Sequence, residues 1–357
     1  MTFQTFPDPA GGPQVNTSQV HTAEFSGSGS EFFRIWIVNV ILSILTLGIY
    51  LAWAKVRTMQ YLHRNTRLAG ASFDYHARPI VILKGNLVAL ALVLAYGALN
   101  HFFGTTGFVV SIAIILAVVP WLLNRSLRFR LGVTSYRGLR FAFHGSVAKA
   151  YLVFAVWPIL TVFTAYLLAP FTHHAIKSYQ HNNTSYGSTS FRFTAAIRSF
   201  YAIYAVWFVC FAIVVLLPLI VVGVYAYVNA IPGNQATGLI LFGMFWLYLG
   251  AFVLLPLFTV RLRNLIWNHT KLGPHEIVSR VGLGKTAFIW WTSLVLIICT
   301  LGLYTPFARV RWVRYLATST SLVAVGNLDE FVAGQTAGQV GAVGEGMADM
   351  LGIDIAL

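Results

Sequence analysis

Positively charged side chains greatly outnumber negatively charged ones in this sequence. There are 24 Lys and Arg residues against 10 Asp and Glu residues, and every cation except Arg34 lies between Lys55 and Arg314. A cation near an anionic lipid leaflet contributes on the order of 1 kcal/mol to binding. Four arginines recur at one position of a repeated pattern, and two of them precede a tyrosine on the same helix face by four residues. These candidate lipid-contacting residues are Arg57, Arg125, Arg261, Arg311, Tyr61 and Tyr315. The alternative is ordinary positive charge that orients the chain in a membrane.

The acidic residues all lie outside the centres of the apolar segments. Proton- and cation-coupled transporters usually carry a carboxylate at membrane depth, so this placement disfavours ion-coupled transport. Three uncharged polar residues inside apolar segments are candidates for lining a solute path: Asn39, Asn100 and Thr164. The alternative is that they form helix–helix hydrogen bonds, which contribute about 0.6 kcal/mol each.

Patterns typical of enzymes and metal sites are missing from the sequence. The group His173, His174 and His181 has no Cys, Asp or Glu nearby to complete a zinc site. The motif G-L-G-K-T at 282–286 has Ser279 where a phosphate-binding loop needs glycine. No basic soluble domain with interleaved aromatic residues is present to bind nucleic acid. We therefore expect no enzymatic activity, cofactor, metal or nucleic-acid partner.

Composition shows which solvent must surround the elements that position these residues. The chain is 57% hydrophobic and only 10% charged, against roughly 25% charged residues in a typical soluble domain. We therefore expect lipid to cover much of the surface. Apolar segments near the length of about 20 residues that crosses a bilayer lie at 33–54, 80–103, 108–124, 147–171, 200–229, 238–257 and 286–308.

The charge of the connections predicts how these segments are arranged. The connections 104–107 and 230–237 carry no charge, whereas the others are basic. By the positive-inside rule, the segments flanking each uncharged connection form a hairpin that returns to the basic side. The remaining three segments, 33–54, 147–171 and 286–308, either cross fully or are broken and re-entrant. Candidate break points are Gly48, Trp157–Pro158 and Gly302.

An internal repeat is the most informative pattern. The segment T-L-G-I-Y-L-A-W-A-K-V-R at 46–57 matches T-L-G-L-Y-T-P-F-A-R-V-R at 300–311. Aligning these two copies on a threonine brings in three further copies. The aligned threonines are Thr66, Thr134, Thr184, Thr270 and Thr320.

Each copy predicts a short basic helix at the membrane interface, followed by a small β-hairpin such as 183–193 around a glycine turn. Five such hairpins on one side could pair into a small cap. The predicted fold class is an all-α polytopic membrane protein with about seven hydrophobic segments, some of them re-entrant, and repeated short cytoplasmic β-hairpins. We expect a flexible N-terminal segment at 1–30, a repeat-built transmembrane domain at 31–322 and an acidic, small-residue cytosolic tail at 323–357.

Further motifs are F-S-G-S-G-S-E-F-F (25–33), Asn39 and G-E-G-M-A-D (344–349). Together with the two T-L-G-x-Y segments, they make nearly the whole chain resemble the YjgN-like family of bacterial multi-pass inner-membrane proteins of unknown function. The resemblance implies a location in the bacterial inner membrane and supplies no activity.

Two classes of function are open at this point. One is transport of a small solute or lipid, with a path between the repeats. The other is a non-catalytic protein that binds anionic membrane lipids or organises the envelope. In both cases we expect the basic loops to lie in the cytoplasm.

Overall fold

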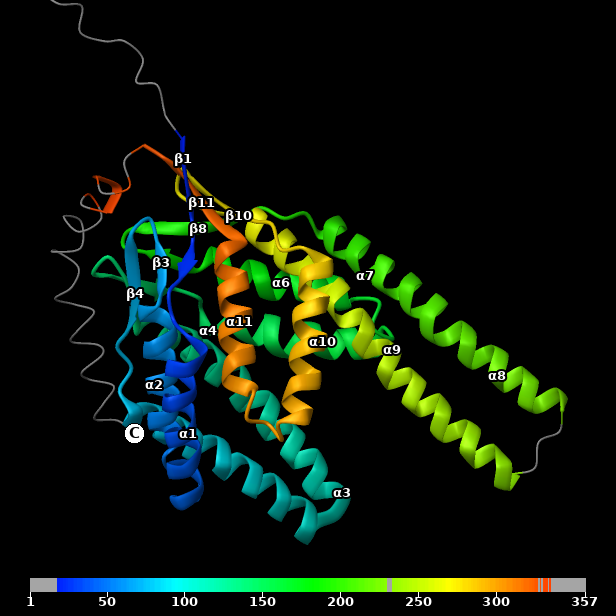
Figure 1. The fold of residues 1–357 in the computed structure, drawn as a ribbon. Coiled ribbons are helices and arrows are strands. Elements are labelled where there is room, and N and C mark those ends of the chain that lie inside the picture. Colours follow the sequence, from blue (N-terminus) through cyan, green and yellow to red (C-terminus); the bar gives the residue numbers. More distant parts are fainter. Residues whose placement is uncertain (1–17, 230–232, 327, 329, 333, 335–357) are drawn as a thin grey trace, which may run out of the picture.

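The computed structural model describes residues 18–229, 233–326, 328, 330–332 and 334. Short strands gather at one end of the molecule, and the helices extend away from them (Figure 1). The strands form one antiparallel sheet of eleven strands. They are β1 (Ser18–Thr22), β2 (Glu24–Phe25), β3 (Thr66–Leu68), β4 (Ala71–Tyr75), β5 (Thr134–Tyr136), β6 (Leu139–Phe143), β7 (Thr184–Tyr186), β8 (Thr189–Phe193), β9 (Thr270–Leu272), β10 (His275–Ser279) and β11 (Thr320–Val325).

The two outer strands of this sheet are consecutive in the chain. The order is β1-β11-β10-β9-β8-β7-β6-β5-β4-β3-β2, and only Ala23 separates β1 from β2. The N–H of Ala23 donates to the carbonyl of Thr320 over 2.9 Å. One extended N-terminal segment therefore bridges the two ends of the sheet and makes it a nearly closed, barrel-like ring.

The helices form five pairs that each return to this sheet. The helical segments are α1 (Gly29–Leu45), α2 (Leu51–Arg64), α3 (Pro79–Gly132), α4 (Val147–Tyr151), η1 (Leu152–Val156), α5 (Trp157–Phe163), α6 (Ala169–Asn182), α7 (Ile197–Phe211), η2 (Ala212–Leu216), α8 (Leu217–Val228), α9 (Gly233–Asn268), α10 (Leu283–Cys299) and α11 (Thr305–Thr318). We call each pair with its strands a unit. Units 1 to 4 start at α1, α3, α4 and α7 and end with β4, β6, β8 and β10, and unit 5 combines α10, α11 and β11 with the N-terminal β1–β2.

The five junctions between units share one backbone hydrogen bond. In each junction the residue after one unit's last strand donates its N–H to the carbonyl that precedes the aligned threonine of the next unit. The pairs are Ser26–Asn65, His76–Val133, His144–Asn183, Thr194–His269 and Arg280–Ser319, at 2.7–2.9 Å. The junction between units 5 and 1 has the same geometry as the other four, so the ring closes without a distorted step.

Units 2 and 4 contain the long helices. Helix α3 reverses at Gly104, where φ is 52° and ψ is −128°. Because Asn100 Nδ2 lies 3.5 Å from Ser111 Oγ, although eleven residues of straight helix would separate them by about 16 Å, α3 is a hairpin of two legs. In the part of the chain that the structure describes, three helical segments are long and apolar enough to cross a membrane: Pro79–Gly132, which contains both legs of α3, Ile197–Val228 and Thr237–Asn268.

Units 1, 3 and 5 contain short helix pairs. Their first helical segments end in tight reversals at residues with positive φ: Leu47 and Gly48, Ala165 and Tyr166, Leu301 and Gly302. Gly48 and Gly302 are therefore confirmed as break points. Trp157–Pro158 was the wrong break point in the segment 147–171, because the π-helical turn η1 ends at Val156 and leads directly into α5, which begins at Trp157. A π-turn shifts the carbonyl that would clash with a proline ring, so the helix continues past Pro158.

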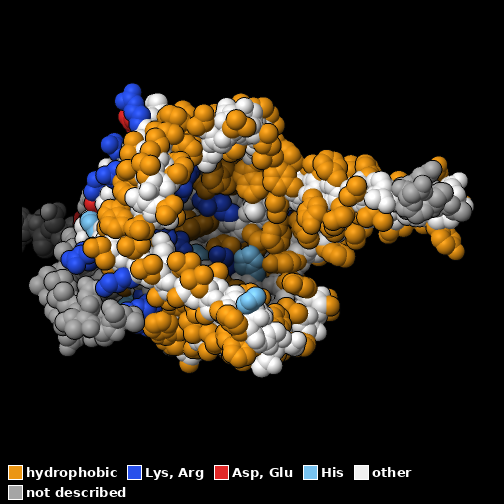
Figure 2. Space-filling view, turned by 90° about the horizontal axis from the view of Figure 1, so that it is seen from below, with side chains coloured by type: hydrophobic (Ala, Val, Ile, Leu, Met, Phe, Trp, Pro, Cys, Tyr) orange, Lys and Arg blue, Asp and Glu red, His pale blue; other side chains and the backbone are white. Residues whose placement is uncertain are grey.

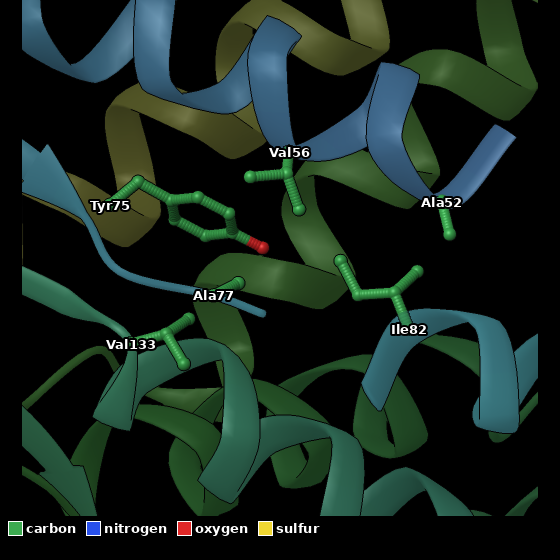
Figure 3. Packing of buried hydrophobic residues seen from close by; sticks show 6 residues of the cluster. All are labelled: Ala52, Val56, Tyr75, Ala77, Ile82 and Val133. Atoms are coloured by element: carbon green, nitrogen blue, oxygen red, sulfur yellow. The ribbon is translucent and has the colours of Figure 1, made fainter. Parts of the chain in front are cut away.

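Packing between consecutive units fills the space near the sheet. Val56 of α2 and Ile82 of α3 belong to one buried cluster with Tyr75, Ala77 and Val133 (Figure 3). A second cluster gathers aromatic side chains of the strands around Tyr136 and Tyr186, together with Phe331 and Val332 from beyond β11. We call this second cluster the aromatic plug, and it draws on β3 to β9.

The predicted all-α class is wrong, because the hairpins pair side by side into one eleven-stranded sheet. Strands of two to six residues are unstable alone, and in the ring each gains partners from adjacent units. The number of about seven crossing segments is also wrong. The segments 33–54, 147–171 and 286–308 each break into two short helices, and a helix of 17 residues spans about 25 Å, less than the hydrocarbon core.

The predicted boundaries differ at both ends of the chain. Strands β1 and β2 lie within 1–30, the segment expected to be flexible, and β11 crosses the boundary placed after residue 322. Residues 335–357 of the predicted acidic tail lie outside the described residues.

Candidate functional site

The four aligned arginines lie on the outer side of the helix ring. On α2, Val56 packs against the next unit and Leu62 against Phe32 of its own unit. These two contacts divide the circumference of α2 into a wider and a narrower sector. Arg57 lies in the wider sector, which faces outward in a closed ring. Arg125, Arg261 and Arg311 hold the same position in units 2, 4 and 5.

Aromatic rings hold three of these guanidinium groups. Arg57 lies 5.8 Å from the ring centroid of Tyr50, Arg125 lies 5.4 Å from that of Trp121, and Arg311 lies 5.3 Å from that of Phe288. Arg311 also donates to Thr292 Oγ1 over 2.7 Å, whereas Arg261 is exposed. Cation–π contacts of this kind leave the donor edge of a guanidinium available to a phosphate.

Unit 1 adds a concave site to this outer surface. A groove of about 520 Å³ lies between α1 and α2 and is lined by Arg34, Ile35, Val38, Arg57, Gln60, Tyr61, Arg64 and Asn65. Such a volume is typical of small-molecule sites. Arg34 is the residue that sequence reasoning missed, because it stands apart from the other cations. Leu152, Ala202 and Phe288 occupy its position in units 3, 4 and 5, whereas Lys84 occupies it in unit 2.

The charge of this groove is only partly compensated. Arg64 Nε donates to Asp74 Oδ1 over 3.0 Å. Partial burial acts to raise the pKa of Asp74, but hydrogen bonds from the Tyr75 N–H and from Arg64 outweigh it and lower this pKa. Among the described residues, neither Arg34 nor Arg57 forms an ion pair with an acidic side chain. These two guanidiniums can therefore accept an anionic group in the groove.

The aligned tyrosines connect the two helices of a unit. The hydroxyl of Tyr61 donates to the Ser28 carbonyl over 2.9 Å, and that of Tyr315 donates to the Gly282 carbonyl over 3.0 Å. Tyr179, which was not singled out, makes the same bond to Ser146 over 3.0 Å. In each case the partner lies 33 residues earlier, at the start of the unit's first helix. These hydroxyls therefore form hydrogen bonds within the protein. The Tyr61 hydroxyl also lies within hydrogen-bond distance of Glu31 Oε2, at 3.0 Å.

The three polar residues inside apolar segments lie in three separate units. Asn39 is buried and points its Nδ2 at the Ala54 carbonyl over 3.5 Å, while its Oδ1 has no hydrogen-bond partner. Asn100 donates to the Tyr96 carbonyl over 2.7 Å and approaches Ser111 at the tip of α3. Thr164 donates to the Leu160 carbonyl over 2.8 Å. The structure does not bring the three residues together into one path.

One constellation on the sheet has the residue types of a hydrolase. Ser135 Oγ lies 2.8 Å from His76 Nε2, and the same nitrogen lies 3.9 Å from Asp74 Oδ2. A catalytic triad needs the carboxylate on the other ring nitrogen. The next unit repeats the contact as His144 Nε2 to Ser185 Oγ at 3.0 Å, with no aspartate. We therefore ascribe the histidine–serine contact to sheet packing.

Comparisons with known proteins place the chain among uncharacterised membrane proteins. A family model described as "Bacterial protein of unknown function (DUF898)" matches residues 20–350. The inner membrane protein YjgN of Salmonella typhimurium strain LT2 is 23% identical over 356 residues, covering 87% of this chain and 89% of the relative. The inner membrane protein YjgN of Escherichia coli K12 is 33% identical over 146 residues, covering 39% of this chain and 35% of the relative. No solved structure matches the chain.

Proposed function

We propose, since this chain belongs to the DUF898 family of bacterial proteins of unknown function, that it is a non-catalytic inner-membrane protein that binds anionic phospholipids. The groove between α1 and α2 is the main binding site in this proposal. The relatives with curated names are inner membrane proteins, and the long apolar helices fit the same location. The sheet and the basic connections beside it would then lie toward the cytoplasm, where positive charge accumulates.

The main support for the proposal is that the groove has apolar side chains next to basic ones. Ile35 and Val38 line it from α1, whereas Arg34, Arg57 and Arg64 supply guanidiniums beside them. A phospholipid has the same arrangement, with an anionic phosphate next to acyl chains. Guanidiniums bind phosphate oxygens through paired N–H groups, and the apolar lining can cover the first part of an acyl chain.

Lipid binding is favoured over transport by the aromatic plug at the sheet end. Tyr136 and Tyr186 sit in the middle of this cluster, and the Tyr186 hydroxyl donates to the Tyr136 carbonyl over 2.9 Å. A solute path along the ring axis would need this packed cluster to move. The outer groove needs no such movement, because it is open on the protein surface.

The test compares lipids that co-purify with matched variants after mild detergent extraction. The double variant Arg34→Gln/Arg57→Gln removes two cations from the groove. The control Arg140→Gln/Arg192→Gln removes two exposed cations from the sheet. We expect the ratio of anionic to zwitterionic phospholipid to fall several-fold in the groove variant and to stay at the wild-type value in the control.

Two outcomes would contradict this proposal. An unchanged ratio in the groove variant would show that the groove does not select anionic lipid. An equal fall in both variants would show that the lipid responds only to net charge. Thermal unfolding of both variants identifies any loss of folding before lipid is measured.

A further inference from the structure

The helix ring encloses a hollow with basic walls. Seen from the end away from the sheet, the molecule has a central opening with a hydrophobic rim, and Lys, Arg and His side chains appear inside it (Figure 2). At the opposite end the aromatic plug fills the sheet. The hollow is thus open toward the apolar end of the molecule.

The helix register shows which residues face this hollow. The second helix of each unit packs on one flank against the next unit and on the other against the first helix of its own unit. The narrower sector between these flanks contains the positions seven and eleven residues before the aligned threonine. That sector faces the axis of a closed ring. Cations occupy these positions in four of the five units: Lys55, Lys177, Arg263 and Arg309.

Contacts between α6 and α9 bring two of these cations into one basic cluster. Lys177 acts electrostatically on both His173 and His181, which lie one turn before and one turn after it on α6. The His181 ring lies 5.7 Å from that of Trp267, and the Arg263 guanidinium lies 5.9 Å from the same indole. Trp267 therefore links Lys177 and His181 on one side to Arg263 on the other.

This cluster has no acidic counterpart on its helices. None of the described acidic residues lies on α6, α9 or α11. Lys177 Nζ donates to Gln180 Oε1 over 3.2 Å, and Arg263 Nη2 donates to Thr320 Oγ1 over 3.4 Å. The Nε of Arg263 is buried without a hydrogen-bond partner. A buried charged donor left unpaired is costly, and a bound anion would satisfy it.

We propose that the hollow is a second binding site, separate from the outer groove, which holds the phosphate of an anionic lipid between Lys177 and Arg263. The opening at the apolar end admits a ligand from the bilayer, and the plug closes the route from the sheet. Burial lowers the pKa of Lys177, and a phosphate beside it would restore the charged form. His173 and His181, with pKa values of about 4, are neutral at pH 7 and can serve as hydrogen-bond partners.

Native mass spectrometry of the full-length protein in a nonionic detergent tests this site. The probes are phosphatidylglycerol, phosphatidylcholine with the same acyl chains, and inorganic phosphate. We expect the double variant Lys177→Gln/Arg263→Gln to lose at least about tenfold in affinity for one phosphatidylglycerol molecule, because two charge-assisted contacts are removed. The charge-retaining variant Lys177→Arg/Arg263→Lys should keep most of that affinity.

The groove variant Arg34→Gln/Arg57→Gln separates the two sites. If both exist, each double variant loses a different lipid and the combined variant loses both. Failure of the outer groove would leave the loss caused by Lys177→Gln/Arg263→Gln unchanged. The hollow site is refuted if that variant binds as many phosphatidylglycerol molecules as the wild type at every concentration. Competition by inorganic phosphate as strong as that by the lipid would refute a lipid ligand and identify a free phosphate instead.

Discussion

Phe25 of β2 lies directly opposite Thr66 of β3, and this pair joins the N-terminal strand to the first unit. Every other junction between units contains the same pairing of a strand's last residue with the aligned threonine. Those pairs are Tyr75–Thr134, Phe143–Thr184, Phe193–Thr270 and Ser279–Thr320. The N-terminal segment β1–β2 therefore takes the place of the second strand of unit 5. In the sequence, 298 positions separate Thr22 of β1 from Thr320 of β11.

Ring closure can be tested with an engineered disulfide. Thr22 and Ser321 are paired across β1 and β11, and their hydroxyl oxygens lie 3.0 Å apart. In a background lacking Cys210 and Cys299, the variant Thr22→Cys/Ser321→Cys should form an intramolecular disulfide on mild oxidation and migrate faster without reductant. The control Val20→Cys/Ser321→Cys, offset by two residues, should form less. Equal yields for the two pairs would contradict the register.

The reversal of α3 can be tested at Gly107. A Cβ atom at this position would lie 1.8 Å from the Leu99 carbonyl oxygen of the opposite leg, whereas a Cβ at Gly97 would meet nothing within 4 Å. We expect Gly107→Ala to lower the Tm by several degrees, and Gly97→Ala to leave it unchanged or raise it, because alanine favours helix by up to about 1 kcal/mol. Differential scanning fluorimetry measures both. A tolerated Gly107→Ala would show that the two legs do not touch there.

The tyrosine contact between helices predicts a stability loss. In Tyr315→Phe the Gly282 N–H, which donates to the hydroxyl over 2.7 Å, loses its partner. We expect a loss of about 1–2 kcal/mol in the free energy of unfolding. Tyr227→Phe is the matched control, because the Tyr227 side chain is 87% exposed. Similar denaturation curves for the two variants would argue against the contact.

The histidines of α6 predict a pH dependence of stability. Burial, with a smaller effect from the Lys177 charge, lowers the pKa values of His173 and His181 from 6.5 to about 4. Between these values the unfolded chain binds more protons than the folded one, so protonation favours unfolding. The histidine contribution to stability is full above pH 6.5 and is lost as the pH falls to 4. His173→Gln/His181→Gln should flatten the dependence of Tm on pH in this window. An unchanged slope would show that other groups cause the loss of stability in acid.

The orientation proposed above predicts one-sided labelling. Ser190 and Pro274 are exposed on the sheet in units 3 and 4. In the cysteine-free background, Ser190→Cys and Pro274→Cys should react with an impermeant maleimide in inverted membrane vesicles and not in intact spheroplasts. Labelling of either residue from the outside would place the sheet on the other side of the membrane.

Sequence analysis predicted the local elements and hairpins that could pair into a cap, but it did not predict that β1 and β2 close these hairpins into one ring-shaped sheet. The glycine reversals at Gly48 and Gly302 and the hairpin within α3 follow from local patterns, because uncharged turns and special backbone angles leave a residue signature. The pairing of β2 with β3 does not, because a strand of two residues carries no periodicity. The all-α prediction failed at this step, where long-range pairing converts separate hairpins into one sheet.

The candidate site residues also fall into two groups: those that sequence spacing identified and those whose placement depends on tertiary packing. Arg57 and Arg311 were found because they repeat at a fixed distance from a threonine. Arg34 escaped notice because it lies apart from the basic connections, and its proximity to Arg57 depends on how α1 packs against α2. Lys177 and Arg263 were counted only as loop charge. Their inward direction follows from ring closure, which sequence spacing alone does not predict.

The use of an N-terminal strand to complete the last unit has a consequence for biogenesis. Residues 18–22 are synthesised first, but their partner β11 emerges about 300 residues later, which at bacterial rates of about 5–20 residues per second is a delay of roughly 15–60 s. During that time the growing protein has two open strand edges. These edges stay unpaired until translation ends, so we expect truncated products that lack β11 to be especially prone to aggregation and proteolysis.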